Sequence, residues 1–252
     1  MSAAEGAAGA DGGLGAADAA EEVPGFRELG VVAFTTTRQA GSFGTAGDEP
    51  VGQVMARWSA LRVRLGAAGR CFATASQVHG AHVLVHEPAW TGWLRADEAD
   101  GHVAPRAAMG LAVTVADCVP VFLAHPAGGI GVLHSGWKGT VARIVERGIA
   151  AFREHGQAPD ELRVHLGPAI CGRCYEVSPD VHRALTGHAA MGPAPVDLRA
   201  VIAEHARAAG VRHITMSPSC TRCDQARFFS HRGGDAGRQL GVIAHAPGMR
   251  EA

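Results

Sequence analysis

Three segments of the sequence carry an apolar run directly into a residue that can bind a metal or act as a nucleophile. They are SQVHG at 76–80, VTVADCVPVFL at 113–123 and GVLHSGWKGT at 131–140. We expect His79, Cys118 and His134 to lie at strand ends, where layered α/β proteins place their sites. Two imidazoles and a thiolate form a ligand set typical of catalytic zinc, whose fourth position stays open for water or substrate.

Two mechanisms fit these three residues. Zinc would hold Cys118 as a thiolate and lower the pKa of its water toward neutrality, which gives a hydroxide for attack on a polarised carbon. Alternatively, Cys118 is itself the nucleophile and His134 or His79 is its base, as in cysteine hydrolases. Each histidine considered separately also fits a hydrogen-bonded residue of the core. The spacing alone leaves these alternatives open.

The turn GWKGT invites comparison with a phosphate-binding loop. That loop requires lysine after its second glycine, whereas here Lys138 precedes Gly139. A helix that begins at this turn still presents free N–H groups to an anion. We therefore interpret the segment as a strand-to-helix turn and keep Lys138 as a candidate anion contact.

Other polar residues flank the three segments. Gln77 ends a predicted strand, and Asp117 interrupts an apolar run beside Cys118. Arg38 lies between a strand and a loop that contains glycine, and Arg232 and Arg238 flank a glycine-rich turn. Guanidinium groups suit carboxylate or phosphate, although a surface salt bridge is the usual role of any one arginine.

The chain has six cysteines, and four of them form the two C-x-x-C pairs Cys171/Cys174 and Cys220/Cys223. Zinc ribbons use such pairs, but usually about 15 to 20 residues apart, and these two pairs are farther apart in the sequence. The first pair also continues into an apolar segment. We therefore expect buried or unpaired thiols here, rather than a four-cysteine zinc site.

Composition narrows the class of protein. The chain has 252 residues, 23 Lys and Arg against 24 Asp and Glu, and a formal net charge of −1. The basic residues are scattered, which argues against nucleic acid as partner and favours small-molecule substrates. The Ala/Gly-rich residues 1–25 are expected to be a disordered tail, with the folded domain over 26–250. No secretory signal or membrane span is evident, so we expect a cytoplasmic protein.

Alternation of short β-branched runs with helical patterns predicts one α/β or α+β domain with a mixed sheet. Helices are expected over 51–65, 139–154 and 197–210, the first with Asp48 and the last with Asp197 as N-cap. Strands are expected over 31–36, 71–78, 82–87, 111–115, 121–124, 130–134, 162–166, 213–217 and 239–245.

In combination, these segments resemble the YfiH/YlmD family, also known as laccase-domain or multicopper polyphenol oxidase-like proteins and as purine nucleoside phosphorylases. The resemblance covers about residues 30 to 245 and follows the family's motif order. The matching segments are FTTTRQAG, SQVHG, EADGHV, VTVADCVPVFL, GVLHSGWKGT, LGPAICGRCYEV, CTRCD and FFSHR followed by GR. The resemblance implies a single-domain layered sandwich with a mixed sheet.

The family resemblance implies zinc held by His79, Cys118 and His134, with copper as the alternative metal. It implies phosphorolysis of adenosine, inosine, guanosine and methylthioadenosine, and deamination of adenosine. Arg38 matches the arginine of the family's TxR segment and is expected to contact phosphate or substrate, together with Gln77 and Lys138. Asp117 or a nearby histidine is the expected proton shuttle.

The resemblance also leaves alternatives. Other members look like peptidoglycan editing factors that act on a Ser-containing nucleotide-linked precursor, and the oxidase label implies polyphenol oxidation with copper. A metal-stabilised binding module is a further, non-catalytic alternative. The chain departs from the family pattern in HSGWKG and FSHRG, where Lys138 replaces an arginine, His231 a tyrosine and Gly233 a second arginine.

Overall fold

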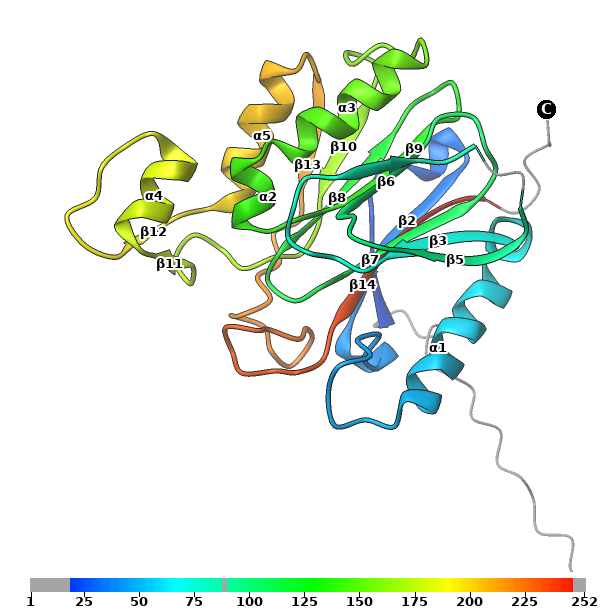
Figure 1. Ribbon diagram of the computed structural model, residues 1–252, viewed down its shortest axis with the longest axis horizontal. Helices are drawn as coiled ribbons and strands as arrows, with labels where there is room; N and C mark the ends of the chain where they lie inside the picture. Colours follow the sequence, from blue (N-terminus) through cyan, green and yellow to red (C-terminus); the bar gives the residue numbers. More distant parts are fainter. Residues whose placement is uncertain (1–18, 88–89, 247–252) are drawn as a thin grey trace, which may run out of the picture.

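Two six-stranded β-sheets pack face to face among the described residues, and helices cover both outer faces (Figure 1). The computed structural model describes residues 19–87 and 90–246. Antiparallel and parallel strand pairs occur in both sheets. This architecture confirms the predicted mixed α/β fold with layered, mixed sheets.

The first sheet contains both the earliest and the latest strands of the described chain. Its parallel pairs join β3 to β5 and β7, and the other pairs are antiparallel. In spatial order the strands are β1 (Ala20–Glu22), β2 (Val31–Thr36), β14 (Gln239–His245), β7 (Gly110–Val115), β3 (Cys71–Ala75) and β5 (Gly92–Ala96).

The second sheet has its most apolar strands, β8 and β9, at its centre. Every residue of both strands is buried, which explains why VPVFLA in β8 and IGVL in β9 are apolar without alternation. In spatial order the strands are β13 (His213–Met216), β10 (Arg163–Leu166), β8 (Val119–Ala124), β9 (Ile130–Ser135), β6 (Gly101–Ala104) and β4 (Val83–Val85). A separate two-stranded sheet pairs β11 (Glu176–Val177) with β12 (Ala194–Pro195).

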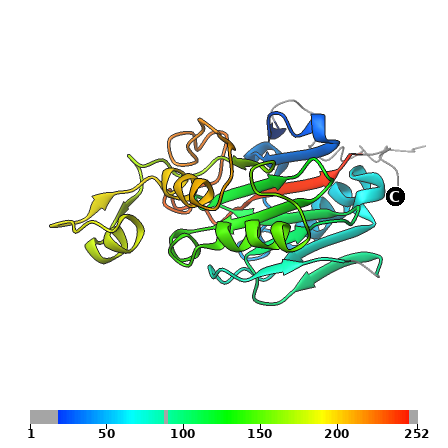
Figure 2. The ribbon, with the colours of Figure 1, turned by 90° about the horizontal axis from the view of Figure 1, so that it is seen from above.

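Three apolar clusters hold the layers together. One fills the space between the sheets, where Leu111 and Val113 of the first meet Phe122 and Val132 of the second. Another packs α1 (Val51–Arg64) on the outer face of the first sheet, and the third packs α3 (Ile144–Glu154) and α5 (Leu198–Ala208) on the second. Figure 2 shows α3 and α5 side by side, while α4 (Pro179–Thr186) projects with β11 and β12 from the body of the molecule.

The helix expected over 139–154 is two helices, α2 (Trp137–Val141) and α3. The break falls at Arg143, whose φ of 62° is left-handed and cannot continue an α-helix. Asp197 caps α5 as predicted, accepting the Arg199 N–H at 3.0 Å, whereas Asp48 makes no cap on α1, which Pro50 precedes directly. Short 3₁₀ turns are η2 (Arg27–Leu29), η3 (Arg38–Ala40) and η4 (Gly66–Gly69).

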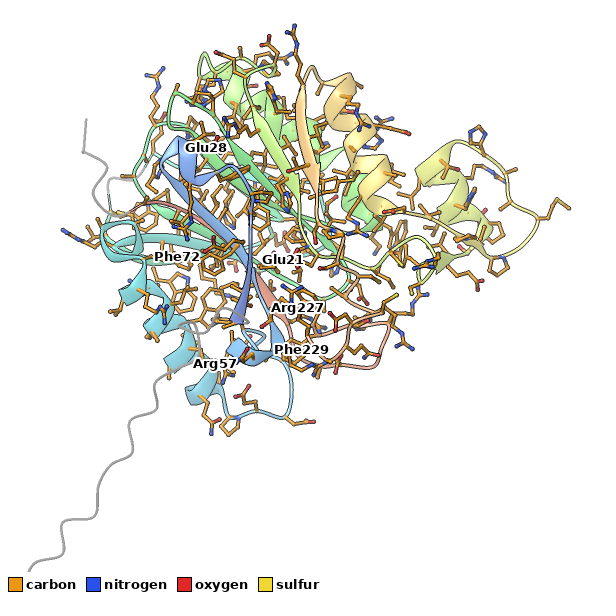
Figure 3. The ribbon with its side chains drawn as sticks, turned by 180° about the vertical axis from the view of Figure 1, so that it is seen from behind. Glu21, Glu28, Arg57, Phe72, Arg227 and Phe229 are labelled. Carbon is orange, nitrogen blue, oxygen red and sulfur yellow. The ribbon has the colours of Figure 1, made fainter. Side chains whose placement is uncertain are left out.

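The tail expected over residues 1–25 includes an ordered part. Residues 1–18 lie outside the described chain, but Ala20–Glu22 form β1, which pairs with β2. The Glu21 carboxylate accepts hydrogen bonds from Ser217 and Ser219 and pairs with Arg227 at 3.0 Å, and Figure 3 shows these two charged side chains together. These contacts hold β1 in place despite its weak strand propensity.

In the part of the chain that the structure describes, no helix has the length and apolar character to cross a membrane.

Candidate metal centre and cleft

The chain passes from one sheet to the other in the three residues between β7 and β8. Asp117 turns the chain there with a left-handed φ of 80°, and Cys118 follows directly before β8. The apolar run around these residues is therefore two strands in different sheets. Cys118 lies at the boundary between the sheets as a result.

His79 lies in the loop that follows β3, and a buried carboxylate holds this loop. The Asp100 side chain is fully buried and accepts backbone N–H bonds from Val78, His79 and Gly80 at 3.2, 2.9 and 2.7 Å. His79 itself has a φ of 59°, a left-handed conformation that is uncommon for histidine. The carboxylate thus fixes a backbone turn that points an imidazole toward Cys118.

His134, on β9, completes the group, and Asp100 orients it as well. Its Nδ1 lies 2.8 Å from Asp100 Oδ1, which leaves Nε2 free to bind a metal. One ligand atom from each of His79, Cys118 and His134 lies within 4.8 Å of the others. The structure therefore brings together the three residues selected from the sequence. It adds Asp100, the aspartate of the EADGHV segment, for which the sequence predicts no role.

The buried charges of this group reinforce one another. Burial favours the neutral thiol of Cys118, but His134 and His79 outweigh it and lower the pKa of Cys118 to about 6. Burial also opposes a charged His134, but Cys118 and Asp100 raise the pKa of His134 to about 9. Cys118 is therefore poised as a thiolate, the form that binds metals and attacks carbon.

Gly136 lets the chain pass close to these ligands. A Cβ at this position would lie 2.9 Å from Cys118 Sγ and 3.3 Å from His79 Cδ2. The glycine in the HSGWKG turn is thus required by the space around the candidate ligands. Trp137, the next residue, packs partly buried against the core.

A cleft of about 640 Å³ opens above the three candidate ligands. Trp58 and Trp93 form an aromatic wall, with ring centroids 5.0 Å apart in a stacked arrangement. Arg95, Arg238 and His231 supply polar and basic groups elsewhere in the lining. The cleft is large enough for a small molecule with one flat, apolar part and one polar part.

Gln77 also lines the cleft, but its amide is largely committed to the protein. The amide nitrogen donates to the Thr114 carbonyl at 2.8 Å, and the amide oxygen accepts from the Thr114 N–H at 2.8 Å. These bonds join the end of β3 to β7. Gln77 therefore shapes the wall near His79.

Arg38 does not line the cleft. Its guanidinium donates to the carbonyls of Gln225 and Phe228 at 2.9 and 3.0 Å and pairs with Asp235 at 2.7 Å. It also lies 4.3 Å from the centre of the Phe229 ring, labelled in Figure 3. The structure thus gives Arg38 contacts that hold the 225–235 loop.

Asp117 and Lys138 also lie outside the cleft lining. The Asp117 carboxylate accepts a bond from Thr221 Oγ1 at 2.6 Å and one from the Arg232 N–H at 2.7 Å, so it ties two loops together. Lys138 Nζ lies 5.7 Å from the centre of the Trp137 ring. Arg238, a candidate anion contact from the sequence, lines the cleft, as does His231, for which the sequence predicts no role in the site.

The four cysteines of the C-x-x-C pairs are free thiols, and Cys220 is buried, as expected, but the two pairs lie together. The four sulfur atoms all lie within 4.8 Å of one another. Long separation along the chain does not keep the pairs apart, because Ala169 and Cys220 form a parallel bridge between their loops.

Comparison with known proteins gives one family and several relatives. The family described as "Multi-copper polyphenol oxidoreductase laccase" matches residues 30–246. A Deinococcus radiodurans protein named purine nucleoside phosphorylase is 37% identical over 77% of this chain and 77% of its own length. Purine nucleoside phosphorylase ORF3 of Streptomyces griseus is 33% identical over 79% and 84%. Adenosine deaminase RL5, from an unknown prokaryotic organism, is 36% identical over 48% and 52%.

Solved structures share the fold. YlmD from Geobacillus stearothermophilus superposes with a TM-score of 0.83 at 29% identity, covering 94% of this chain and 99% of that one. YfiH from Bacillus licheniformis gives a TM-score of 0.80 at 24% identity, covering 90% and 97%.

Proposed function

Since the chain belongs to the multi-copper polyphenol oxidoreductase laccase family, we propose that it is a zinc enzyme acting on purine nucleosides in the cleft above His79, Cys118 and His134. The reactions are phosphorolysis of adenosine, inosine, guanosine and methylthioadenosine, and deamination of adenosine. The relatives named purine nucleoside phosphorylase and adenosine deaminase support both activities. The main support is the compact His-Cys-His set at the floor of an aromatic-walled cleft.

The donor set fits zinc. A thiolate and two imidazoles are borderline ligands of the kind zinc prefers, and three protein ligands leave a position for substrate. Asp100 fixes His134 with Nε2 free, as carboxylates do behind metal-bound histidines. When bound here, zinc supplies a Lewis acid that polarises an oxygen at the reaction centre.

The cleft residues have separate tasks in this proposal. Trp93 offers its indole face to the flat purine base, and Arg95 and Arg238 attract phosphate. His231 replaces Asp117 as the proposed proton donor to the departing base, because Asp117 is occupied by Thr221 and Arg232. Arg38 acts as a positioning residue for the loop that carries His231.

Copper oxidation fits less well. Oxidases of the multicopper type need several copper ions and many histidine ligands. Among residues 19–87 and 90–246, the candidate metal groups are this His-Cys-His set and the four cysteines. The proposal also keeps a cytoplasmic location, where the cysteines remain reduced.

Activity assays on the purified chain test the proposal. Inosine with phosphate is expected to release hypoxanthine and ribose 1-phosphate, and adenosine is expected to give inosine without phosphate. His79→Ala should abolish both reactions, whereas His82→Ala, an exposed histidine in the same loop, should leave them unchanged. Absence of base release from every purine nucleoside would refute the phosphorylase assignment.

A second candidate is a hydrolase that clears a Ser-containing, nucleotide-linked cell-wall precursor, with Cys118 as nucleophile. The observation in its favour is the lowered pKa of Cys118 beside His134. Turnover of that precursor that survives chelation but not thiol alkylation would favour this hydrolase. Activity lost on chelation and restored by zinc would favour the metal enzyme.

A further inference from the structure

We propose that Cys171, Cys174, Cys220 and Cys223 bind a second zinc ion, separate from the His-Cys-His centre, which clamps together two loops beside the cleft. This structural site is independent of the proposed activity. It rests on the position of four thiols, on the turns that carry them and on the charges next to them.

The spacing of the sulfur atoms suits one tetrahedral ion. Zinc–sulfur bonds of about 2.3 Å place the four sulfurs of such a site about 3.8 Å apart. Here all four sulfurs lie within 4.8 Å of one another, and Cys174 and Cys223 are 3.4 Å apart. An iron–sulfur cluster needs wider spacing, because its cysteines bind different iron atoms. The geometry therefore favours a single ion.

Each C-x-x-C pair is folded into a tight turn. The Cys174 N–H donates to the Cys171 carbonyl at 2.9 Å, and the Asp224 N–H donates to the Cys220 carbonyl at 3.0 Å. The N–H groups of Cys171 and Cys223 both point at Cys220 Sγ, at 3.2 and 3.4 Å. Backbone donors to sulfur stabilise the thiolate form that a metal requires.

Backbone bonds between the turns bring the two pairs into register. Ala169 and Cys220 form a parallel bridge, and the Thr221 N–H donates to the Ala169 carbonyl at 3.2 Å. These backbone contacts hold the two pairs next to each other.

The neighbouring charges match a tetrathiolate zinc site. Zinc with four thiolates carries a net charge of about −2, and each pair encloses one arginine, Arg173 in CGRC and Arg222 in CTRC. Cys220 is buried, whereas Cys223 is exposed, so the site lies at the surface. Each pair thus carries a cationic side chain within its own turn, which suits a site of this net charge.

Hydrogen bonds connect the loops of the four cysteines to residues beside the cleft. Thr221, next to Cys220, donates to Asp117, whose neighbour is the candidate ligand Cys118. The loop after Cys223 supplies the Gln225 and Phe228 carbonyls that hold Arg38. A zinc ion in this cluster would therefore stiffen the wall of the candidate active site from outside.

Metal analysis of the intact chain, expressed in zinc medium and purified under reducing conditions, tests the inference. We expect about two zinc atoms per chain, falling to about one in Cys174→Ser/Cys223→Ser and in His79→Ala/His134→Ala. X-ray absorption of the His79→Ala/His134→Ala variant should show zinc with sulfur ligands only, at about 2.3 Å. Cys71→Ser, outside both groups, is the matched control and should keep both ions.

A measurement on the unaltered chain covers the case in which the serine variants fail to fold. Titration with a mercurial reagent should release about two zinc ions per chain, one as the four clustered thiols react and the other as Cys118 reacts. The inference is overturned if zinc content is insensitive to the cysteine pairs, if the cluster holds iron, or if Cys174 and Cys223 form a disulfide without zinc. Loss of nucleoside activity alone would not bear on it.

Discussion

Asp100 contacts both histidine-bearing parts of the candidate metal centre. It bonds to the His134 ring and to the backbone of the His79 turn. Removing its charge should lower zinc affinity about 10- to 100-fold, because metal-bound histidines depend on such partners. Asp100→Asn should show this loss in a chelator competition assay.

The control for that experiment is Asp97→Asn. Asp97 is an exposed carboxylate three residues earlier in the chain, so this variant should retain zinc. Equal zinc affinity in Asp100→Asn and the unaltered chain would contradict the orienting role.

Gly136 gives a second test at the level of single residues. The added Cβ in Gly136→Ala would press on Cys118 Sγ at 2.9 Å. Overpacking of this kind costs about 1–3 kcal/mol in the free energy of unfolding. The loss, measured by chemical denaturation, should be larger with zinc bound, because a coordinated Cys118 cannot move away.

Gly52→Ala is the comparison, since a Cβ at Gly52 in α1 meets nothing within 4 Å. This change should leave stability unchanged or raise it slightly. Equal effects of the two substitutions would mean that the space beside Cys118 is not restricted.

Among the connecting segments, η3 and the 225–235 loop depend on Arg38. Lysine cannot reproduce the guanidinium bonds to two carbonyls and Asp235. We expect Arg38→Lys to lower the free energy of unfolding by about 1.5–3 kcal/mol, the usual range for lost hydrogen bonds to a charged group. Thermal denaturation measures this loss.

The same variant separates two roles of Arg38. As a positioning residue, Arg38→Lys should reduce kcat while leaving KM for phosphate close to the original. A large rise in KM for phosphate with unchanged stability would instead support the substrate contact expected from the sequence. Arg70→Lys, an exposed arginine elsewhere, is the control.

The sequence predicts elements well where one pattern dominates. The strand expected over 239–245 has those bounds in the structure, and strands over 31–36 and 130–135 agree closely. It misses β5 and β6 because their short segments carry charged or small residues and show neither a continuous apolar run nor a clear alternation. The sequence also predicts α2 and α3 as one helix, because the left-handed backbone at Arg143 does not change the spacing of the apolar residues.

The candidate site was predictable only where a local sequence pattern marks its residues. His79, Cys118 and His134 are recognisable from their positions at strand ends and from the family motifs. Asp100, the cysteine cluster and the contacts of Arg38 depend on distances between remote segments. A local sequence pattern does not show which remote segments will lie next to each other in the fold.

The stability of the folded protein should depend on pH through a buried histidine, His165. Burial lowers the pKa of His165 from 6.5 to about 4, with Glu21 opposing the shift. Between these values the unfolded chain binds a proton that the folded chain does not, so stability falls as pH falls. From about pH 7.5 to pH 5, this one group should cost about 2 kcal/mol.

His165→Gln should therefore flatten the decline of Tm between these two pH values. His213→Gln, an exposed histidine on the neighbouring strand, should not change the slope. An unchanged slope in His165→Gln would show that other groups account for the acid sensitivity.

The crossing of the chain between the sheets at residues 116–118 has a kinetic consequence. His79 follows a strand of the first sheet, His134 belongs to the second, and Cys118 lies on the boundary. The full ligand set thus exists only after the two sheets have docked. Zinc should accordingly slow unfolding while leaving the rate of refolding nearly unchanged, as stopped-flow measurements with and without the ion would register. The ion would bind in the last step of folding and would have to dissociate before the two sheets can separate.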